Sequence, residues 1–286
     1  MKGKALAFGA GTVVNAIATG RGAAFGLNLW TRAEVTLLNE PGYFEGRILN
    51  DPSEDTKLIL TTVKRVLNHF GIQEYGARVT TNSNIPISRG LKSSSVAANA
   101  VALATVAALK KDINDLDVVR IGVDAALEAG VTITGAFDDA CASYFGGFVV
   151  TDNTKRLLIK RQPIEEDLAV MIHIPVKKSR TVESNVKRIK AMKDYVEHVF
   201  NLALNGDYRT AITLNGLIHS AALGFDAEAT VRALEAGAVS AGLTGTGPAT
   251  IALCSRDACG DVESSWSELE GEIIRTKFNN EKAKVI

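Results

Sequence analysis

Three consecutive serines follow a glycine, a leucine and a lysine, and they lead directly into an apolar, alanine-rich run. The stretch reads Pro86-Ile-Ser88-Arg89-Gly90-Leu91-Lys92-Ser93-Ser94-Ser95. Gly90 can take backbone angles that a side chain would forbid, and a helix that begins at the serines would start with N–H groups that lack partners inside the helix. Those N–H groups and the positive end of the helix dipole attract phosphate. The stretch therefore predicts a phosphate-binding loop, with a plain serine cap of the helix as the alternative.

Two adjacent carboxylates, Asp138 and Asp139, lie among small and apolar residues. Burying an unpaired carboxylate is costly, so a pair in such surroundings usually serves a cation or a proton transfer. The alternative is a turn in which one aspartate caps the segment that follows. The pair is therefore the candidate for chemistry on a bound group.

Two glycine-rich segments near the ends of the chain add further candidate site elements. They are Gly3-Lys4-Ala-Leu-Ala-Phe8-Gly9 with its continuation from Thr12 to Gly26, and the run from Gly242 to Leu253, which contains Gly245-Thr246-Gly247-Pro248. Gly9 and Gly11 also fit the start of a dinucleotide-binding fingerprint. Val14 occupies the third small position of that fingerprint, where helix and strand must approach closely, so the dinucleotide alternative is disfavoured.

The serine loop has no Walker pattern and resembles the P-x-x-x-G-L-G-S-S-A loop of the GHMP kinases, the superfamily of galactokinase, homoserine kinase and mevalonate kinase. It departs from that loop at two positions, with Lys92 in place of the second glycine and Ser95 in place of the alanine. This GLKSSS variant and the run from Thr12 to Gly26 resemble the archaeal shikimate kinases within the superfamily. The run from Gly242 to Leu253 resembles the third GHMP motif, so the resemblance spans nearly the whole chain.

The resemblance implies an enzyme that uses ATP and Mg²⁺ to phosphorylate shikimate to shikimate 3-phosphate, in the shikimate pathway of aromatic amino-acid biosynthesis. Another GHMP kinase activity, on homoserine or mevalonate, is the alternative, because it would keep the phosphate residues and change only the acceptor pocket. A noncatalytic ligand sensor derived from a kinase is the second alternative. The presence of Asp138 together with Ser94 argues against the sensor.

The resemblance also assigns residues to the site. The expected ATP contacts are Pro86, Ser88, Arg89, Gly90, Leu91, Lys92, Ser93, Ser94, Ser95, Gly245, Thr246 and Gly247. Asp138 is the expected catalytic residue, as a base or as a group that orients the acceptor hydroxyl, and Lys4 is expected to polarise that exchange. Ser94 and Glu128 are the expected Mg²⁺ ligands, although Glu128 fits a solvent-facing helix position equally well. Lys92 is expected to contact the nucleotide, with a solvent-facing side chain as the alternative.

The expected acceptor carries a carboxylate and several ring hydroxyls. Its pocket should therefore contain a guanidinium group for bidentate pairing and neutral polar groups for orientation. We expect Arg21 and Arg180 to supply guanidinium groups, with ordinary surface arginines as the alternative. Thr12 and Asn15 are expected to contact hydroxyls, beside Asp138.

A mixed α and β fold must position these residues. Residue patterns predict strands at 34–38, 78–81 and 147–151 and helices at 56–70, 93–110 and 117–129. After a polar stretch at 152–166, they predict a strand at 168–174, helices at 184–205, 208–223 and 226–236, a strand around Ile251 and a last helix. We therefore expect an α+β, two-lobed fold with domains at 1–155 and 156–286. The resemblance to GHMP kinases implies a left-handed βαβ unit in the first lobe and a ferredoxin-like second lobe.

Composition limits the possible partners. With 286 residues, 46% of them hydrophobic, the chain can bury the cores of two lobes. Its 32 basic and 32 acidic residues argue against nucleic acid as a partner, because phosphate-backbone binding needs a basic excess or a basic run. The sequence has neither a bilayer-spanning stretch nor a signal-peptide pattern, so no membrane partner and a cytoplasmic location are expected. The three cysteines form no C-x-x-C pair and are expected to be free thiols, and the four histidines lack the spacing of zinc ligands.

Overall fold

This computed structural model describes residues 1–86, 90–176 and 185–286. Within these residues, the long hairpin of β1 and β2 forms the centre of a seven-stranded sheet. Its strands are β1 (Lys2–Val14), β2 (Arg21–Leu38), β3 (Phe44–Ile48), β4 (Gly76–Ser83), β5 (Phe148–Asp152), β6 (Leu157–Gln162) and β11 (Lys284–Val285). The order is β11-β1-β2-β4-β3, with β5 paired to β2 and β6 paired to β5. β3 and β4 are parallel and are joined by helix α1 (Lys57–His69), so they form a βαβ unit.

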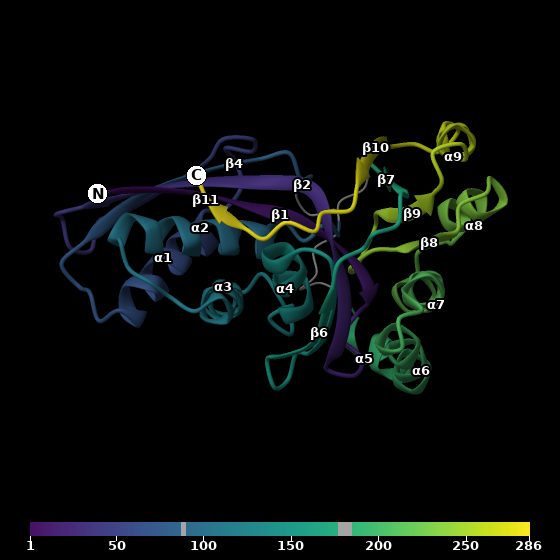
Figure 1. The fold of residues 1–286 in the computed structure, drawn as a ribbon, viewed down its shortest axis with the longest axis horizontal. Helices are drawn as coiled ribbons and strands as arrows, with labels where there is room; N and C mark the ends of the chain where they lie inside the picture. Colours follow the sequence, from purple (N-terminus) through teal and green to yellow (C-terminus); the bar gives the residue numbers. More distant parts are fainter. Residues whose placement is uncertain (87–89, 177–184) are drawn as a thin grey trace.

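β2 is long enough to pair with two different strands in addition to β1. Residues 31–38 of β2 pair with β4, and residues 21–25 pair with β5. The register between β1 and β2 shifts between Phe8 and Gly9 and again between Thr12 and Val14, and such irregularities bend a pair of strands. The hairpin therefore runs from the helix-covered part of the sheet to the place where the second lobe begins (Figure 1).

Helices α1 to α4 cover one face of this sheet, below β1, β2 and β4 in Figure 1. They are α1 (Lys57–His69), α2 (Ser93–Leu109), α3 (Asp115–Ala129) and α4 (Phe137–Phe145). The central helix α2 is almost entirely apolar and contacts β1, β2 and the other three helices, as expected for a helix that is hydrophobic on all sides. At Gly3 an added Cβ would lie 2.1 Å from the Ala104 carbonyl oxygen. β1 and α2 therefore pack backbone against backbone.

The second lobe is built on an antiparallel sheet. Its strands are β7 (Ala169–Ile174), β8 (Ser240–Leu243), β9 (Thr250–Cys254) and β10 (Glu272–Lys277), and its helices are α5 (Val186–Ala191), α6 (Lys193–Leu204), α7 (Tyr208–Leu223), α8 (Glu228–Glu235) and α9 (Cys259–Trp266). The strands follow the order β10-β7-β9-β8. A β-α-β-β-α-β succession with its first and third strands in the middle is the ferredoxin-like arrangement, so the expected architecture of this lobe is confirmed.

Most of the predicted elements are present, with differences at the joints. The predicted helix at 208–223 agrees with α7, whereas the predicted helix at 184–205 is replaced by α5 and α6, which are separated at Met192. The domain division at 155 stays a prediction, and two strands beyond that point, β6 and β11, pair with strands of the first sheet. Among the described residues, no helix is long and apolar enough to cross a membrane.

Candidate active site

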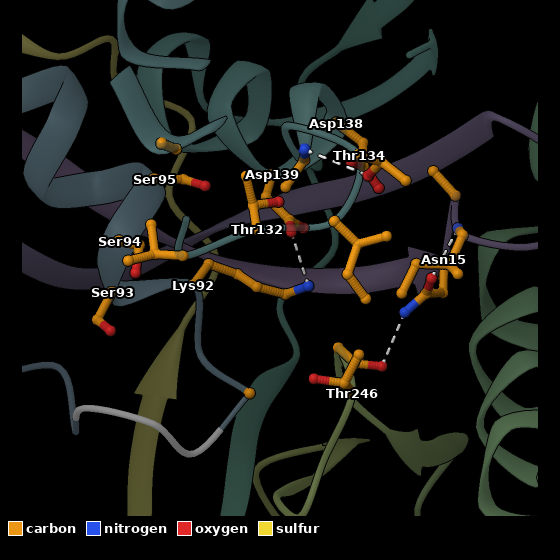
Figure 2. Close-up of a pocket in the computed structure, with 18 of the residues that line it drawn as sticks. Asn15, Lys92, Ser93, Ser94, Ser95, Thr132, Thr134, Asp138, Asp139 and Thr246 are labelled. Carbon is orange, nitrogen blue, oxygen red and sulfur yellow. Dashed lines mark hydrogen bonds and ion pairs between the residues drawn. The ribbon is translucent and has the colours of Figure 1, made fainter. Parts of the chain in front are cut away.

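A cavity of about 210 Å³ lies where the start of α2 meets α4, the turn after β1 and the turn after β8. The predicted site residues among its lining are Asn15, Gly90, Leu91, Lys92, Ser93, Ser94, Ser95, Asp138, Gly245 and Thr246. Figure 2 shows Lys92 extending from the start of α2 toward Asp139, with Asn15 and Thr246 on another side of the cavity. The fold thus brings four separate stretches of the sequence to one place.

The start of α2 has the features of an anion-binding site. Lys92 precedes the helix in the left-handed conformation, with φ 64° and ψ 23°, and among the described residues no side chain caps the helix start. The Val96 N–H donates to the Lys92 carbonyl at 3.2 Å, which is the first helical hydrogen bond. The N–H groups of the three preceding serines lack partners inside the helix and are available to phosphate. The serine-cap alternative therefore has no support in this geometry.

The phosphate loop packs against the turn between β8 and β9. Gly90 has φ +82°, and an added Cβ there would lie 2.5 Å from the Thr244 carbonyl oxygen. Both the backbone angle and the close approach require glycine. Pro86 and Gly247, two of the predicted ATP contacts, belong to these loops but are not among the residues that line the cavity.

Thr12 and Asn15 connect the first lobe to the same turn. The Gly245 N–H donates to Thr12 Oγ1 at 2.8 Å, and Asn15 Nδ2 donates to the Gly245 carbonyl at 2.9 Å. Asn15 Oδ1 accepts from the Ile17 N–H at 2.9 Å, and the Asn15 N–H donates to Asn215 Oδ1 on α7 at 3.0 Å. These two predicted substrate contacts thus hold the turn in place, and only Asn15 lines the cavity.

Lys92 and Asp139 form a buried ion pair inside the cavity. Lys92 Nζ lies 2.9 Å from Asp139 Oδ2, and the two side chains are only 9% and 8% exposed. Asp139 Oδ1 has no hydrogen-bond partner within the part of the chain that the structure describes. The lysine of the phosphate loop therefore reaches the carboxylate pair directly, which rules out the solvent-facing alternative for its side chain.

Asp138 is buried beside this ion pair and has a strongly shifted pKa. Burial and, after it, the charge of Asp139 raise the pKa of Asp138 to about 7, although Lys92 and the hydrogen bond from Asn153 oppose the shift. Asn153 Nδ2 donates to Asp138 Oδ1 at 2.8 Å. A carboxyl group with a pKa near the working pH is suited to accept a proton from a substrate.

The first turn of α4 and strand β2 together fix the position of Asp138. Asp138 and Asp139 lie in the first turn of the helix, where the helix dipole favours negative charge, and no described side chain caps that helix. A Cβ added at Gly22 would lie 2.4 Å from Asp138 Oδ2. Gly22 therefore leaves the space that the carboxylate occupies, and the helix-cap alternative for the aspartates has no support.

Two other predicted site residues lie on the surface, away from the cavity lining. Lys4 Nζ lies 2.8 Å from Glu34 Oε2, and the Lys4 side chain is 53% exposed. The Glu128 carboxylate lies 2.8 Å from the Arg65 guanidinium and is likewise 53% exposed. The structure therefore does not bring Lys4 or Glu128 to the cavity, because each has a partner on a neighbouring element of the first lobe.

Arg21 is not in the cavity lining either. Arg21 forms an ion pair with Glu197 of α6, and its guanidinium lies 4.5 Å from the centre of the Phe200 ring. This contact holds Arg21 against the second lobe. Arg180, Ser88 and Arg89 lie outside the described residues.

Sequence reasoning missed several lining residues. Glu54, from the loop before α1, and the segment at 130–136, between α3 and α4, contribute to the cavity wall. Asn153 does not line the cavity but contacts Asp138 from behind. Their positions follow from tertiary packing, and the motifs contain no signal for them. Together the residues can bind an anion at the start of α2 and take up a proton at Asp138.

Comparison with known proteins identifies relatives along the whole chain. The family model described as the GHMP kinases N terminal domain matches residues 57–147. A shikimate kinase of Methanosarcina mazei is 48% identical, over 99% of this chain and 96% of that protein. A shikimate kinase of Methanothrix thermoacetophila is 49% identical, over 100% of this chain and 96% of that protein.

Solved structures with the same fold are more distant in sequence. A homoserine kinase from Cytophaga hutchinsonii superposes with a TM-score of 0.78 at 18% identity and covers 100% of this chain and 97% of its own. The mevalonate kinase of Methanococcus jannaschii gives a TM-score of 0.76 at 16% identity and covers 98% of both chains. These structures confirm the expected two-lobed fold.

Removal of one partner of the buried ion pair should lower stability strongly, because the other charge would stay buried without compensation. Lys92→Met would leave Asp139 buried without its cation, so we expect the free energy of unfolding at about pH 8, measured by urea denaturation, to fall by about 3 kcal/mol or more. The double variant Lys92→Met/Asp139→Asn should recover part of that loss. As a control, Lys282→Met removes an exposed pair with Asp115 and should cost less than about 1 kcal/mol. Equal losses for Lys92→Met and Lys282→Met would contradict the buried pairing.

Proposed function

The chain belongs to the shikimate kinases of the GHMP kinase superfamily, and on that premise we propose that it transfers the γ-phosphoryl group of ATP to a hydroxyl of shikimate. The products are shikimate 3-phosphate and ADP. The observation that carries this proposal is that one cavity joins the uncapped start of α2 to the buried carboxyl group of Asp138. An anion site and a proton acceptor side by side are what phosphoryl transfer to an alcohol requires.

The phosphate groups of ATP would bind at the start of α2. The serine N–H groups and the helix dipole supply donors and partial positive charge there, and Lys92 adds a full charge from the same loop. Thr246 and Gly245 line the cavity from the second lobe, so closure over the nucleotide would involve both lobes. Phosphoryl transfer depends mainly on such positioning and charge neutralisation.

Mg²⁺ fits only part of the ligand set that the sequence suggests. The Ser94 hydroxyl lines the cavity and is the oxygen ligand that would accompany phosphate oxygens. Glu128 is held by Arg65, so its role as a ligand stays a prediction. When bound with ATP, Mg²⁺ supplies neutralisation of the charge on the transferring phosphoryl group.

Asp138 would take the proton of the acceptor hydroxyl. As the hydroxyl oxygen forms a bond to the γ-phosphorus, the bond from that phosphorus to the bridging oxygen breaks, and ADP leaves with the electron pair. The released hydroxyl proton goes to the Asp138 carboxylate, whose pKa of about 7 permits it at neutral pH. Lys92, paired with Asp139, keeps positive charge between the phosphate loop and the carboxylates.

The described residues that are expected to contact the acceptor already have partners within the protein. Arg21 is engaged by Glu197, and the polar atoms of Thr12 and Asn15 are engaged by the Gly245 turn. A carboxylate-bearing acceptor would need a guanidinium or ammonium partner. We propose Arg180 for this role from its sequence position, together with Arg21 if the acceptor displaces Glu197.

Acceptor choice tests the proposed function. ADP release should be measured with shikimate, homoserine, mevalonate and galactose at matched concentrations. We expect kcat/KM for shikimate to exceed that for each other acceptor by at least about 100-fold, because a pocket built for several hydroxyls leaves polar groups unpaired with the wrong substrate. A preference for homoserine or mevalonate would reassign the acceptor, and no ADP release with any of them would favour the sensor alternative.

The role of Asp138 can be tested by an isosteric change. Asp138→Asn keeps the shape but cannot take up the hydroxyl proton, so we expect kcat to fall by about 100-fold or more. The KM for ATP should stay nearly unchanged. Asp139→Asn is the matched comparison, and a larger loss of kcat for Asp139→Asn than for Asp138→Asn would mean that the two carboxylates have exchanged roles.

A further inference from the structure

Asn153 is fixed on three sides and points its amide at Asp138. It directly follows β5, and its side chain is buried. Its backbone N–H donates to the Gly20 carbonyl at 2.8 Å. The Thr151 hydroxyl donates to Asn153 Oδ1 at 2.7 Å, and Asn153 Nδ2 donates to Asp138 Oδ1 at 2.8 Å. A buried amide with its oxygen and nitrogen both engaged has one defined orientation.

The Thr151 hydroxyl lies 2.7 Å from Asn153 Oδ1 and 3.3 Å from the Gly22 carbonyl oxygen, so the shorter contact to Asn153 is the stronger hydrogen bond and indicates which end of the amide faces Asp138. A hydroxyl that donates to Oδ1 places the carbonyl of Asn153 toward Thr151, and the NH₂ group then faces the carboxylate. An N–H donor favours the ionised form of a carboxyl group, whereas a facing carbonyl oxygen would repel it. Thr151 is itself anchored by the pairing of β5 with β2, where it lies opposite Gly22.

Asn153 and Gly22 contact the two oxygens of the Asp138 carboxylate from different sides. Oδ1 of Asp138 accepts the amide hydrogen bond, while Oδ2 lies beside Gly22, where an added Cβ would approach to 2.4 Å. Oδ2 thus occupies the space that a side chain at position 22 would take. Asn153 on one oxygen and Gly22 beside the other therefore set the rotation of the carboxyl group.

We propose that Asn153, oriented by Thr151, is a positioning residue that holds the Asp138 carboxylate ionised and fixes its rotation for uptake of the proton of the acceptor hydroxyl. This proposal rests on the proposed function in one respect, namely that Asp138 is the proton acceptor. Asn153 is not among the residues that line the cavity. It acts on the reaction only through Asp138.

Few other groups near Asp138 could favour its ionised form. Asp139, next to it on α4, opposes ionisation, and Lys92 from the phosphate loop favours it. Cys141, further along α4, is a neutral thiol whose pKa is raised well above its usual value by burial. Gly22 of β2 and Asn153, which directly follows β5, also face Asp138, and neither residue titrates. Removal of the Asn153 amide would therefore leave Lys92 as the main group that favours the ionised form.

The test is a direct titration of Asp138 that needs no acceptor. In protein labelled with ¹³C at aspartate carboxyl groups, the Asp138 resonance is assigned by its loss in Asp138→Asn. We expect a midpoint of about 7 in the parent protein. Asn153→Leu, which keeps the side-chain size and removes the donor, should raise the midpoint by about one to two pH units, the usual worth of a hydrogen bond to a charged group.

A second pair of variants keeps the proposal testable if Asn153→Leu does not fold. Thr151→Val removes the hydroxyl that orients the amide and should also raise the midpoint, whereas Thr151→Ser keeps the hydroxyl and should restore the parent value. Thr105→Val is the matched control, because the buried Thr105 hydroxyl bonds only within α2, to the Val101 carbonyl at 2.7 Å. It should leave the Asp138 midpoint unchanged.

Kinetics provide the second readout. At about pH 7, Asn153→Leu should lower kcat with the preferred acceptor by about tenfold and leave the KM for ATP unchanged. The loss should shrink to about twofold or less near pH 9, where at least about half of Asp138 is ionised again. An unchanged Asp138 midpoint in Asn153→Leu and Thr151→Val, with only a lower unfolding temperature, would overturn the proposal. Because the titration is independent of the acceptor, that outcome is distinct from a failure of the shikimate assignment.

Discussion

The burial of two adjacent carboxylates beside a single cation is the constraint on which the rest of the site depends. Asp138 and Asp139 lie in the first turn of α4 and are nearly inaccessible to solvent, so their charges need compensation inside the protein. Lys92 compensates Asp139, and Asn153 compensates Asp138. Because Lys92 belongs to the phosphate loop, the same contact places the anion site next to the proton acceptor.

A second set of contacts holds the two lobes together around this centre. Thr12 accepts a hydrogen bond from the Gly245 N–H and Asn15 donates one to the Gly245 carbonyl, and these contacts fix the turn. Gly90 lets the phosphate loop approach the backbone of that turn. The cavity wall therefore consists of loops from both lobes, each tied to the other by short polar contacts. Thr12 and Asn15, which the sequence predicts as substrate contacts, therefore serve to join the two lobes.

The sequence predicted the elements with strong local signals. The serine loop, the aspartate pair and the bounds of α7 follow from glycines, hydroxyls and hydrophobic periodicity, and the structure places them as expected. The sequence could not predict which distant residues become partners, because tertiary packing brings them together. Arg21 is held by Glu197, which lies far away in the sequence, and no local pattern indicates that Asn153 faces Asp138. The break between α5 and α6 has no glycine or proline to mark it.

The central claim is that a buried carboxyl group with a pKa near neutrality accepts the acceptor proton. The most direct measurement is kcat/KM for shikimate in the parent enzyme from about pH 5 to pH 9. The proton acceptor must be ionised, so activity is present above the pKa and is lost as the pH falls through it. The account predicts a plateau above about pH 7 and a tenfold decrease for each pH unit below it. A rate that stays constant across the whole range would contradict proton transfer to Asp138.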